Sequence, residues 1–334
     1  MNAQDIKSVE ALLAAPKKIA IIPHRSPDGD AMGSTLGMYH FLKKLGHMPT
    51  VIAPNEFPGF LAWLPASETV EIFESNKPRV GKIIKEAELV IVMDFNALHR
   101  TGDMENVLNK LTVPFIMIDH HQKPDAFATV TYSDTSFGST CEMLYNFIGY
   151  LGKKDLIDKT IAECIYCGIV TDSGSFRFPS TTPTTHRIVA ELIELGIDNS
   201  EIHSLIFDNN SYESLQLLGK ALDNLKIMPG GKVSYTTLSQ HELDTYNYVK
   251  GDTEGIVNYG LSIKGVKFTA IFIEHADESI VKISFRSKGD FDVNQFARMH
   301  FNGGGHINAA GGKSSQTLAE TVQQFETIVS ALNI

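Results

Sequence analysis

Short apolar runs alternate with segments of helical periodicity along the first 150 residues. The runs are KIAIIPH (18–24), ELVIVMDFN (88–96) and PFIMIDHH (114–121). Strands that are buried on both faces of a parallel sheet have this near-continuous apolar character. Between the first two runs, residues 30–46 repeat their apolar positions at helical spacing. The pattern predicts a doubly wound α/β domain with a parallel sheet.

After these runs, the sequence pattern is first helical and then, from about residue 230, typical of β-strands. Helical periodicity continues through four segments, residues 139–152, 158–176, 181–196 and 211–228. Three segments rich in Val, Ile, Thr and Phe then read as strands (231–239, 266–275 and 279–289), and residues 318–332 read as a closing helix. We therefore expect a smaller α/β domain at the C-terminus. The predicted division is a catalytic metal-binding domain over 1–190, a helical connector over 191–229 and a substrate-binding domain over 230–334.

Composition and charge argue against a protein that binds long nucleic acid, spans a membrane or depends on disulfides. The chain has 334 residues, 43% hydrophobic and 20% charged, with a formal net charge of −10. That charge argues against binding long nucleic acid through a broad basic face. No apolar stretch is long enough to span a bilayer, and the N-terminus lacks the features of a signal peptide. The three cysteines cannot form a disulfide framework, so we expect a cytoplasmic protein with no membrane partner.

Each of the three apolar runs ends in acids or histidines. These residues are His24, Asp94 and Asp119, and they lie at or near the carboxyl ends of the predicted strands. Ligands of open α/β sheets bind at this edge. The full set expected at this edge is His24, Asp28, Asp30, Asp94, Asp119, His120, His121 and Asp172. So many acids and histidines in one place would repel one another or lose their charge without a cation. Carboxylates and imidazoles are ligands of divalent metals, so the pattern predicts a metal site.

Two ions fit the number of donors better than one. With Asp94 shared, the first ion takes His24 and Asp28, and the second takes Asp30, His120 and Asp172. Paired metals can clamp the attacking and leaving oxygens of a phosphoryl displacement. Taken alone, Asp28-Gly29-Asp30 would be a turn with a helix N-cap, and the other residues would be ordinary loop positions. Their joint occurrence at strand ends favours the metal site.

A family resemblance rests on five stretches of the sequence. HRSPDGDAMGS (24–34), the isolated Asp94, the Asp119-His120-His121 triplet and TDSGSF (171–176) resemble the DHH phosphoesterases. FNGGGHINAAG (301–311) resembles the glycine-rich signature of their C-terminal DHHA1 domain. The resemblance implies a manganese-dependent hydrolase with two Mn²⁺ ions, for which Mg²⁺ or Co²⁺ could substitute. It also implies that His121 faces the substrate, and that Asp119 orients the histidines.

The same resemblance assigns substrate recognition to the C-terminal half. Three glycines, Gly303, Gly304 and Gly305, would let backbone amides approach a phosphate, next to His306. Arg286 offers a planar guanidinium group to a phosphate. In the N-terminal half, Arg100 is a further candidate for a phosphate contact. The alternatives are a tight turn for the glycines, a surface strand position for Arg286 and a solvated helix start for Arg100.

This chain is short and acidic and carries a DHHA1-like segment. Among the DHH phosphoesterases it therefore resembles the group that degrades RNA of two to five nucleotides (nanoRNase) and dephosphorylates 3′-phosphoadenosine 5′-phosphate (pAp). The expected partners are therefore short RNA oligonucleotides or small phosphorylated nucleotides, without long duplexes, and a homodimer is allowed. Alternatives within the family are a cyclic- or linear-dinucleotide (pApA, pGpA) phosphodiesterase, an exopolyphosphatase and a RecJ-like single-strand exonuclease. Outside catalysis, the alternative is a nucleotide-binding sensor.

Overall fold

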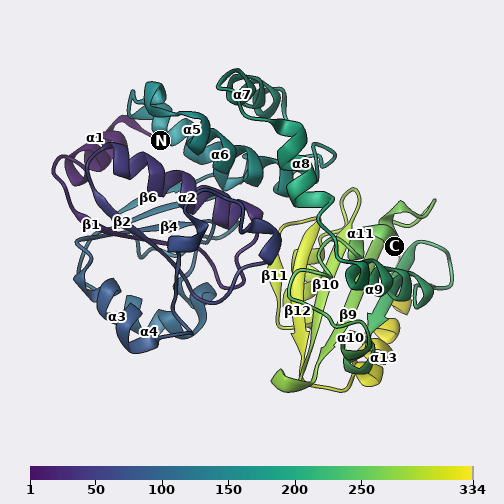
Figure 1. Cartoon of the computed structure of the whole chain (residues 1–334). Coiled ribbons are helices and arrows are strands. Elements are labelled where there is room, and N and C mark those ends of the chain that lie inside the picture. The colour runs from purple at the N-terminus through teal and green to yellow at the C-terminus, as the bar shows by residue number, and fades with distance from the viewer. Residues whose placement is uncertain (333–334) are drawn as a thin grey trace. The chain divides into compact units, whose positions relative to one another are not determined.

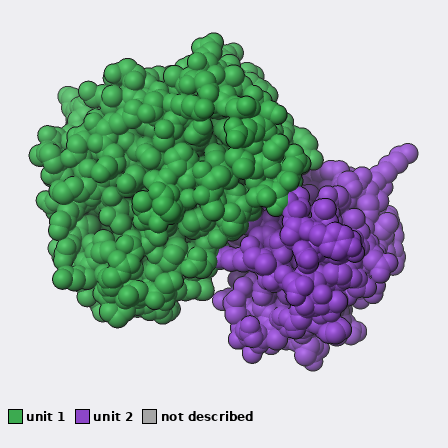
Figure 2. Space-filling view, in the orientation of Figure 1, with its two compact units in different colours: residues 1–209 green, residues 210–334 purple. Residues whose placement is uncertain are grey.

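The structure, a computed structural model, describes residues 1–332 and divides into two compact units. The first unit is Met1–Asn209 and the second begins at Asn210 (Figure 2). This division falls inside the helical connector expected between the two domains. The domain boundaries expected at 190/191 and 229/230 stay a prediction.

The first unit is built on a six-stranded parallel sheet with the order β3-β2-β1-β4-β5-β6. Its strands are β1 (Lys18–Ile22), β2 (Met48–Ala53), β3 (Glu71–Ile72), β4 (Leu89–Met93), β5 (Phe115–Asp119) and β6 (Val130–Ser133). The three apolar runs of the sequence are β1, β4 and β5, which are neighbours at the centre of this sheet. The doubly wound α/β prediction is thereby confirmed.

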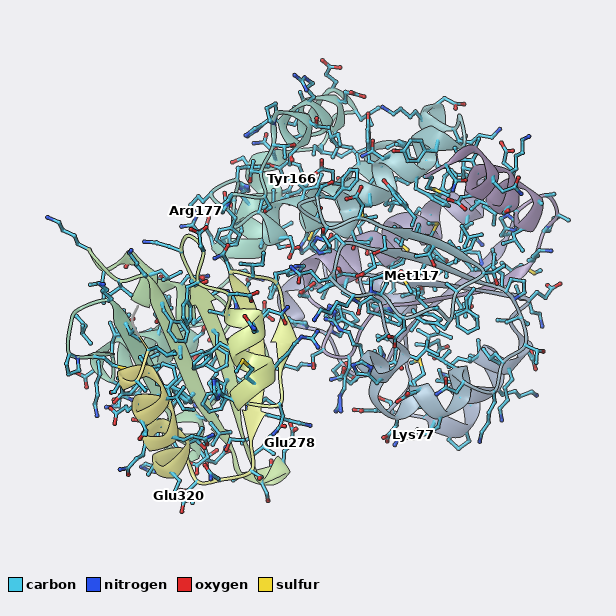
Figure 3. The ribbon with its side chains drawn as sticks, turned by 180° about the vertical axis from the view of Figure 1, so that it is seen from behind. Lys77, Met117, Tyr166, Arg177, Glu278 and Glu320 are labelled. Carbon is cyan, nitrogen blue, oxygen red and sulfur yellow. The ribbon has the colours of Figure 1, made fainter. Side chains whose placement is uncertain are left out.

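Helices cover both faces of this sheet (Figure 1). On one face lie α2 (Gly29–Lys44), α5 (Thr140–Tyr150) and α6 (Lys159–Asp172), and on the other lie α3 (Lys77–Glu86) and α4 (Glu105–Leu108). Alternate residues of β1 supply the two cores, because Ile19 and Ile21 join one apolar cluster while Ala20 and Ile22 join the other. Figure 3 labels Met117 on β5 and Tyr166 on α6, both buried. Three further helices complete the unit: α1 (Ala3–Leu12), α7 (Pro183–Glu194) and α8 (Asn199–Phe207).

The second unit contains a mixed six-stranded sheet with the order β11-β12-β10-β9-β8-β7. Its strands are β7 (Lys226–Ile227), β8 (Val233–Leu238), β9 (Phe268–His275), β10 (Ile280–Ser287), β11 (Gly304–Gly305) and β12 (Ala309–Ser314). Within this second sheet, β8–β9 is the only parallel pair among the described strands, and the other pairs are antiparallel. The helices are α9 (Tyr212–Asp223), α10 (Gln240–Thr245), α11 (Val257–Ser262), α12 (Val293–His300) and α13 (Leu318–Ser330). This mixed sheet with its helices confirms the expected smaller α/β domain.

Several element boundaries differ from the sequence-based expectation. Helix α6 ends at Asp172 rather than at 176, because Gly174, Ser175 and Phe176 all have positive φ and so leave the helical conformation. Helix α9 ends at Asp223, and part of the segment expected to continue it pairs with β8 as strand β7. No helix among residues 1–332 is long and apolar enough to cross a membrane.

Candidate metal centre

The loop after β1 holds its two aspartates in different ways. Asp28 is the N-cap of α2, and its Oδ1 accepts hydrogen bonds from the N–H groups of Asp30 and Ala31, both at 3.1 Å. Its Oδ2 lies 3.8 Å from Nε2 of His24. The helix-cap and the ligand interpretations therefore hold together, because one carboxylate oxygen serves the helix and the other faces the site.

Glycine between these aspartates has a steric reason. A Cβ atom on Gly29 would lie 2.5 Å from Oγ1 of Thr171, the residue that precedes Asp172 in α6. Helices α2 and α6 therefore approach closely at this point. This close approach brings Asp30 and Asp172, which are far apart in sequence, to the same site.

Asp30 is fully buried beneath the site and is held by the N-terminus of α5. Its Oδ2 accepts the backbone N–H of Thr140 at 2.6 Å, and its Oδ1 accepts that of Cys141 at 2.8 Å. Even so, burial and the nearby Asp94 raise the pKa of Asp30 to about 8. The carboxylate is thus surrounded by donors but lacks a full compensating charge, which a bound cation would supply.

Asp94 is the central residue of the site. It follows β4 with a φ of 65°, a conformation that is costly for a residue other than glycine and that recurs at functional sites. Its Oδ2 lies 3.4 Å from Nε2 of His24, and its Oδ1 lies 3.4 Å from Nε2 of His120. Burial by itself would raise the pKa of Asp94, but the hydrogen bonds with His120 and His24 lower it well below its usual value.

The three histidines each have Nδ1 anchored by a protein oxygen. Nδ1 of His24 lies 2.9 Å from the carbonyl oxygen of Arg25, and Nδ1 of His120 lies 3.2 Å from that of Phe137. Because a carbonyl can only accept, each of these Nδ1 atoms carries a proton, and Nε2 is the nitrogen that can bind a metal. Nδ1 of His121 lies 2.7 Å from Oδ1 of Asp119, whose Oδ2 accepts the N–H of His121.

Three compact groups of potential ligands result within the first unit. Their ligand atoms lie within 4.8 Å of one another in each group, and the groups are His24-Asp28-Asp94, Asp30-His120-Asp172 and Asp94-Asp119-His121. Oδ2 of Asp172 lies 3.3 Å from Nε2 of His120. Burial and the neighbouring Asp30 raise the pKa of Asp172 well above its usual value. The donor types and the unbalanced buried carboxylates fit divalent cations.

Two polar residues in the segment after β4, the candidate Arg100 and the neighbouring Asn96, differ in their surroundings. Burial by itself would lower the pKa of His24, but the hydrogen bond with Asp94 and the charge of Asp28 raise it above its usual value, and the positive charge of Arg100 opposes this rise. Burial raises the pKa of Asp119 to about 6, and the charge of Arg100 opposes that rise as well. Both effects show that the charge of Arg100 acts on the site. Asn96 instead joins two loops, since its Nδ2 donates to the carbonyl oxygen of Gln122 at 2.7 Å.

Sequence reasoning missed Thr140. Its hydroxyl donates to Oδ1 of Asp94 at 3.0 Å, and its N–H donates to Asp30, so one residue holds both acids. The available signal was the Ser-Thr pair at the start of the predicted helix 139–152, since Ser139 is the N-cap of α5.

The expected substrate-binding residues Gly303, Gly304, Gly305, His306 and Arg286 all lie in the second unit. The expectation that the glycine amides face a phosphate is not met at Gly303 and Gly305. These amides donate to the carbonyl oxygen of Ala297 at 3.2 Å and to Oδ1 of Asn294 at 3.0 Å. The glycines instead allow close packing, because a Cβ on Gly303 would lie 1.9 Å from the carbonyl oxygen of Gly311.

Comparison with known proteins decides the family. The N-terminal domain of the DHH family matches residues 18–169, and the DHHA1 domain matches residues 230–333. The chain belongs to the DHH family. It is 32% identical to the bifunctional oligoribonuclease and PAP phosphatase NrnA of Thermus thermophilus, over 90% of this chain and 86% of that protein. It is 30% identical to a probable NrnA of Streptococcus mutans, over 98% of both chains.

A solved structure shares the fold of this chain. The crystal structure of an exopolyphosphatase-related protein from Bacteroides fragilis is 38% identical, with a TM-score of 0.93 over 98% of this chain and 96% of that one. This DHH–DHHA1 protein is thus a hydrolase of the phosphoesterase class. The resemblance drawn from the sequence motifs is confirmed.

Proposed function

We propose that this protein is a metal-dependent phosphoesterase that hydrolyses short oligoribonucleotides and pAp with water activated by two metal ions. The observation that carries the proposal is the position of Asp94, whose two oxygens face two separate ligand groups through His24 and His120. The activities named for the curated NrnA relatives support the substrate class.

In this proposal, one ion is held by His24, Asp28 and Asp94, and the other by Asp30, Asp94, His120 and Asp172. When bound, two divalent ions supply charge neutralisation and a water molecule that is acidic enough to act as nucleophile near neutral pH. Mn²⁺ is the expected ion, with Mg²⁺ or Co²⁺ as substitutes. The N-terminus of α5 favours the ionised, ligand-competent form of Asp30, since two backbone N–H groups point at the carboxylate.

His121 has a role separate from metal binding. Its Nδ1 and its backbone N–H are both fixed by Asp119, so Nε2 is the atom that would donate a proton to the leaving oxygen or stabilise charge on the phosphoryl group. Arg100 supplies positive charge beside the same set of acids. Asp119, buried and bound to His121 on both oxygens, acts as an orienting residue rather than as a ligand.

Recognition of the remaining phosphate is assigned to the second unit, through Arg286, His306 and the glycine stretch 303–305. Because Gly303 and Gly305 use their amides within the protein, side chains are the principal contacts in this proposal.

We expect the protein to be located in the cytoplasm. The three cysteines are buried thiols that form no disulfide, which supports a reducing environment.

The test is a competition among substrates with Mn²⁺: pAp, the dinucleotide pApA, a five-nucleotide RNA, cyclic di-AMP and polyphosphate. We expect pAp and the shortest RNAs to have the highest kcat/KM. Faster turnover of polyphosphate would favour an exopolyphosphatase, a function suggested by the name of the Bacteroides fragilis protein. If neither these substrates nor bis-(p-nitrophenyl) phosphate are hydrolysed, the protein is a nucleotide-binding module instead.

A further inference from the structure

Arg298, on α12, has a guanidinium group held in place by a buried side chain. Asn294 is only 4% exposed, and its Oδ1 accepts both the N–H of Gly305 and the Nε–H of Arg298, each at 3.0 Å. One amide oxygen therefore fixes the arginine relative to the glycine-rich strand β11. A guanidinium that is positioned in this way loses less freedom on binding a ligand than a solvated one.

The guanidinium of Arg298 reaches the sheet face that carries Arg286. Gly304 lies opposite Gly311, Gly311 lies opposite Ser284, and Arg286 is two residues further along β10. Directly paired residues, and residues two apart on a strand, project from the same face of a sheet. A Cβ atom on Gly304 would project from this face and would lie 3.5 Å from Nη2 of Arg298.

Arg298 neither binds the carbonyl groups at the end of its helix nor forms a salt bridge among the described residues. An arginine in the last turn of a helix can interact with the free carbonyl groups at the helix end, but Arg298 turns Nε back by one turn to Asn294. Within residues 1–332, none of the salt bridges pairs Arg298 with a carboxylate. Two guanidinium groups, those of Arg286 and Arg298, thus serve the same face, and Nη1 of Arg286 also donates to the carbonyl oxygen of Phe285 at 2.9 Å. The amides of Gly303 and Gly305 beside them are already used within the protein.

We propose that Arg298 binds the non-scissile phosphate of the nucleotide together with Arg286. This inference rests on the proposed function and adds a phosphate-binding residue to it. The Nη atoms of Arg298 would donate to the phosphate oxygens while Nε stays on Asn294, so that the fork keeps its orientation. The small residues Gly304 and Gly311 leave the phosphate access to both arginines.

The experiment is isothermal titration calorimetry of the full chain with Mn²⁺ and adenosine 5′-monophosphate. This compound is the product of pAp hydrolysis and keeps the phosphate that is not cleaved. We expect Arg298→Ala to weaken binding about tenfold, as for loss of a charge-assisted hydrogen bond. Arg298→Lys should recover only part of the loss, because lysine has no fork. Lys264→Ala, an exposed charge-matched control in the same unit, should bind like the wild type.

A second variant guards against misfolding of the first. Asn294→Asp keeps the acceptor oxygen for Gly305 and Arg298 but places a negative charge beside the guanidinium, so it should also weaken binding. Far-UV circular dichroism and thermal unfolding should be unchanged in the variants used. Unchanged affinity in folded Arg298→Ala, or no measurable binding of the nucleotide by the wild type, would overturn the inference.

The inference and the proposed function fail in different ways. Nucleotide binding that depends on Arg298, without hydrolysis of short RNA or pAp, would remove the proposed function and keep the binding site. Hydrolysis of these substrates, with nucleotide affinity independent of Arg298, would remove only the inference.

Discussion

The backbone N–H of Thr140 donates to Oδ2 of Asp30 at 2.6 Å, across 110 residues of sequence. The contact places the positive N-terminal end of helix α5 against a fully buried carboxylate. The hydroxyl of the same threonine holds Asp94. A single helix start thus positions both Asp30 and Asp94, the residue proposed to be shared by the two ions.

Asp94→Asn should abolish most of the hydrolytic activity while the protein stays folded. The substitution removes the charge that faces both ligand groups, so we expect a loss of roughly two to three orders of magnitude in kcat/KM. Metal content, measured by mass spectrometry, should fall below the two ions per chain expected for the wild type. The exposed Asp155→Asn is the matched control and should change neither quantity. Retention of two ions together with wild-type turnover would remove the bridging role.

Asp119→Asn should lower kcat without lowering metal content. The asparagine amide has a single acceptor oxygen where the carboxylate has two, so it could not accept from both the N–H and the Nδ1–H of His121 in the same way. The imidazole would therefore lose its fixed orientation, and loss of such an orienting partner typically costs about 10- to 100-fold. KM should change little, since Asp119 is not assigned to the substrate. If the variant instead loses an ion, Asp119 is a ligand, and the group Asp94-Asp119-His121 is a metal site in its own right.

Gly168→Ala should destabilise the protein and reduce its activity together. A Cβ at this position would lie 2.3 Å from Sγ of Cys141 and 2.6 Å from Oδ1 of Asp30, so the buried carboxylate must move. Overpacking of this kind costs about 1–3 kcal/mol, which urea unfolding can measure. Gly219→Ala, in helix α9 with open space around the new methyl group, is the control and should stabilise the helix by up to about 1 kcal/mol. Equal behaviour of the two variants would show that packing beneath Asp30 is not tight.

Rate against RNA length should separate a short-oligonucleotide hydrolase from a processive exonuclease. With a net charge of −10, the chain offers little long-range attraction to a polyanion. Each phosphate neutralised by protein cations adds roughly 0.7 to the log–log salt slope for single strands, so contact with a few phosphates gives a shallow slope. We expect dimers and trimers to turn over faster than a 24-mer, at two salt concentrations. Rates that climb with length, with a steepening slope, would contradict the proposal and favour a RecJ-like enzyme.

The fold class and the family of this protein could be predicted from local sequence patterns. Buried parallel strands require near-continuous apolar runs, so β1, β4 and β5 could be identified locally, and the acids and histidines beside them indicated one sheet edge. The motif residues then identified the DHH and DHHA1 domains, which the family matches confirm. The strand runs and the motifs could be recognised in the sequence because each depends on a few consecutive residues.

The use of the individual atoms, by contrast, depends on how the chain packs in three dimensions. The Oδ1 of Asp28 caps a helix while its Oδ2 faces His24, and the Asp30 carboxylate meets the start of a helix more than 100 residues away. In the glycine stretch 303–305, the sequence suggested amides that approach a phosphate, whereas packing against α12 leads the amides of Gly303 and Gly305 to donate to Ala297 and Asn294. Local patterns specify which residues can donate or accept. Which partner each one meets depends on how distant helices pack, and no short stretch of sequence contains that information.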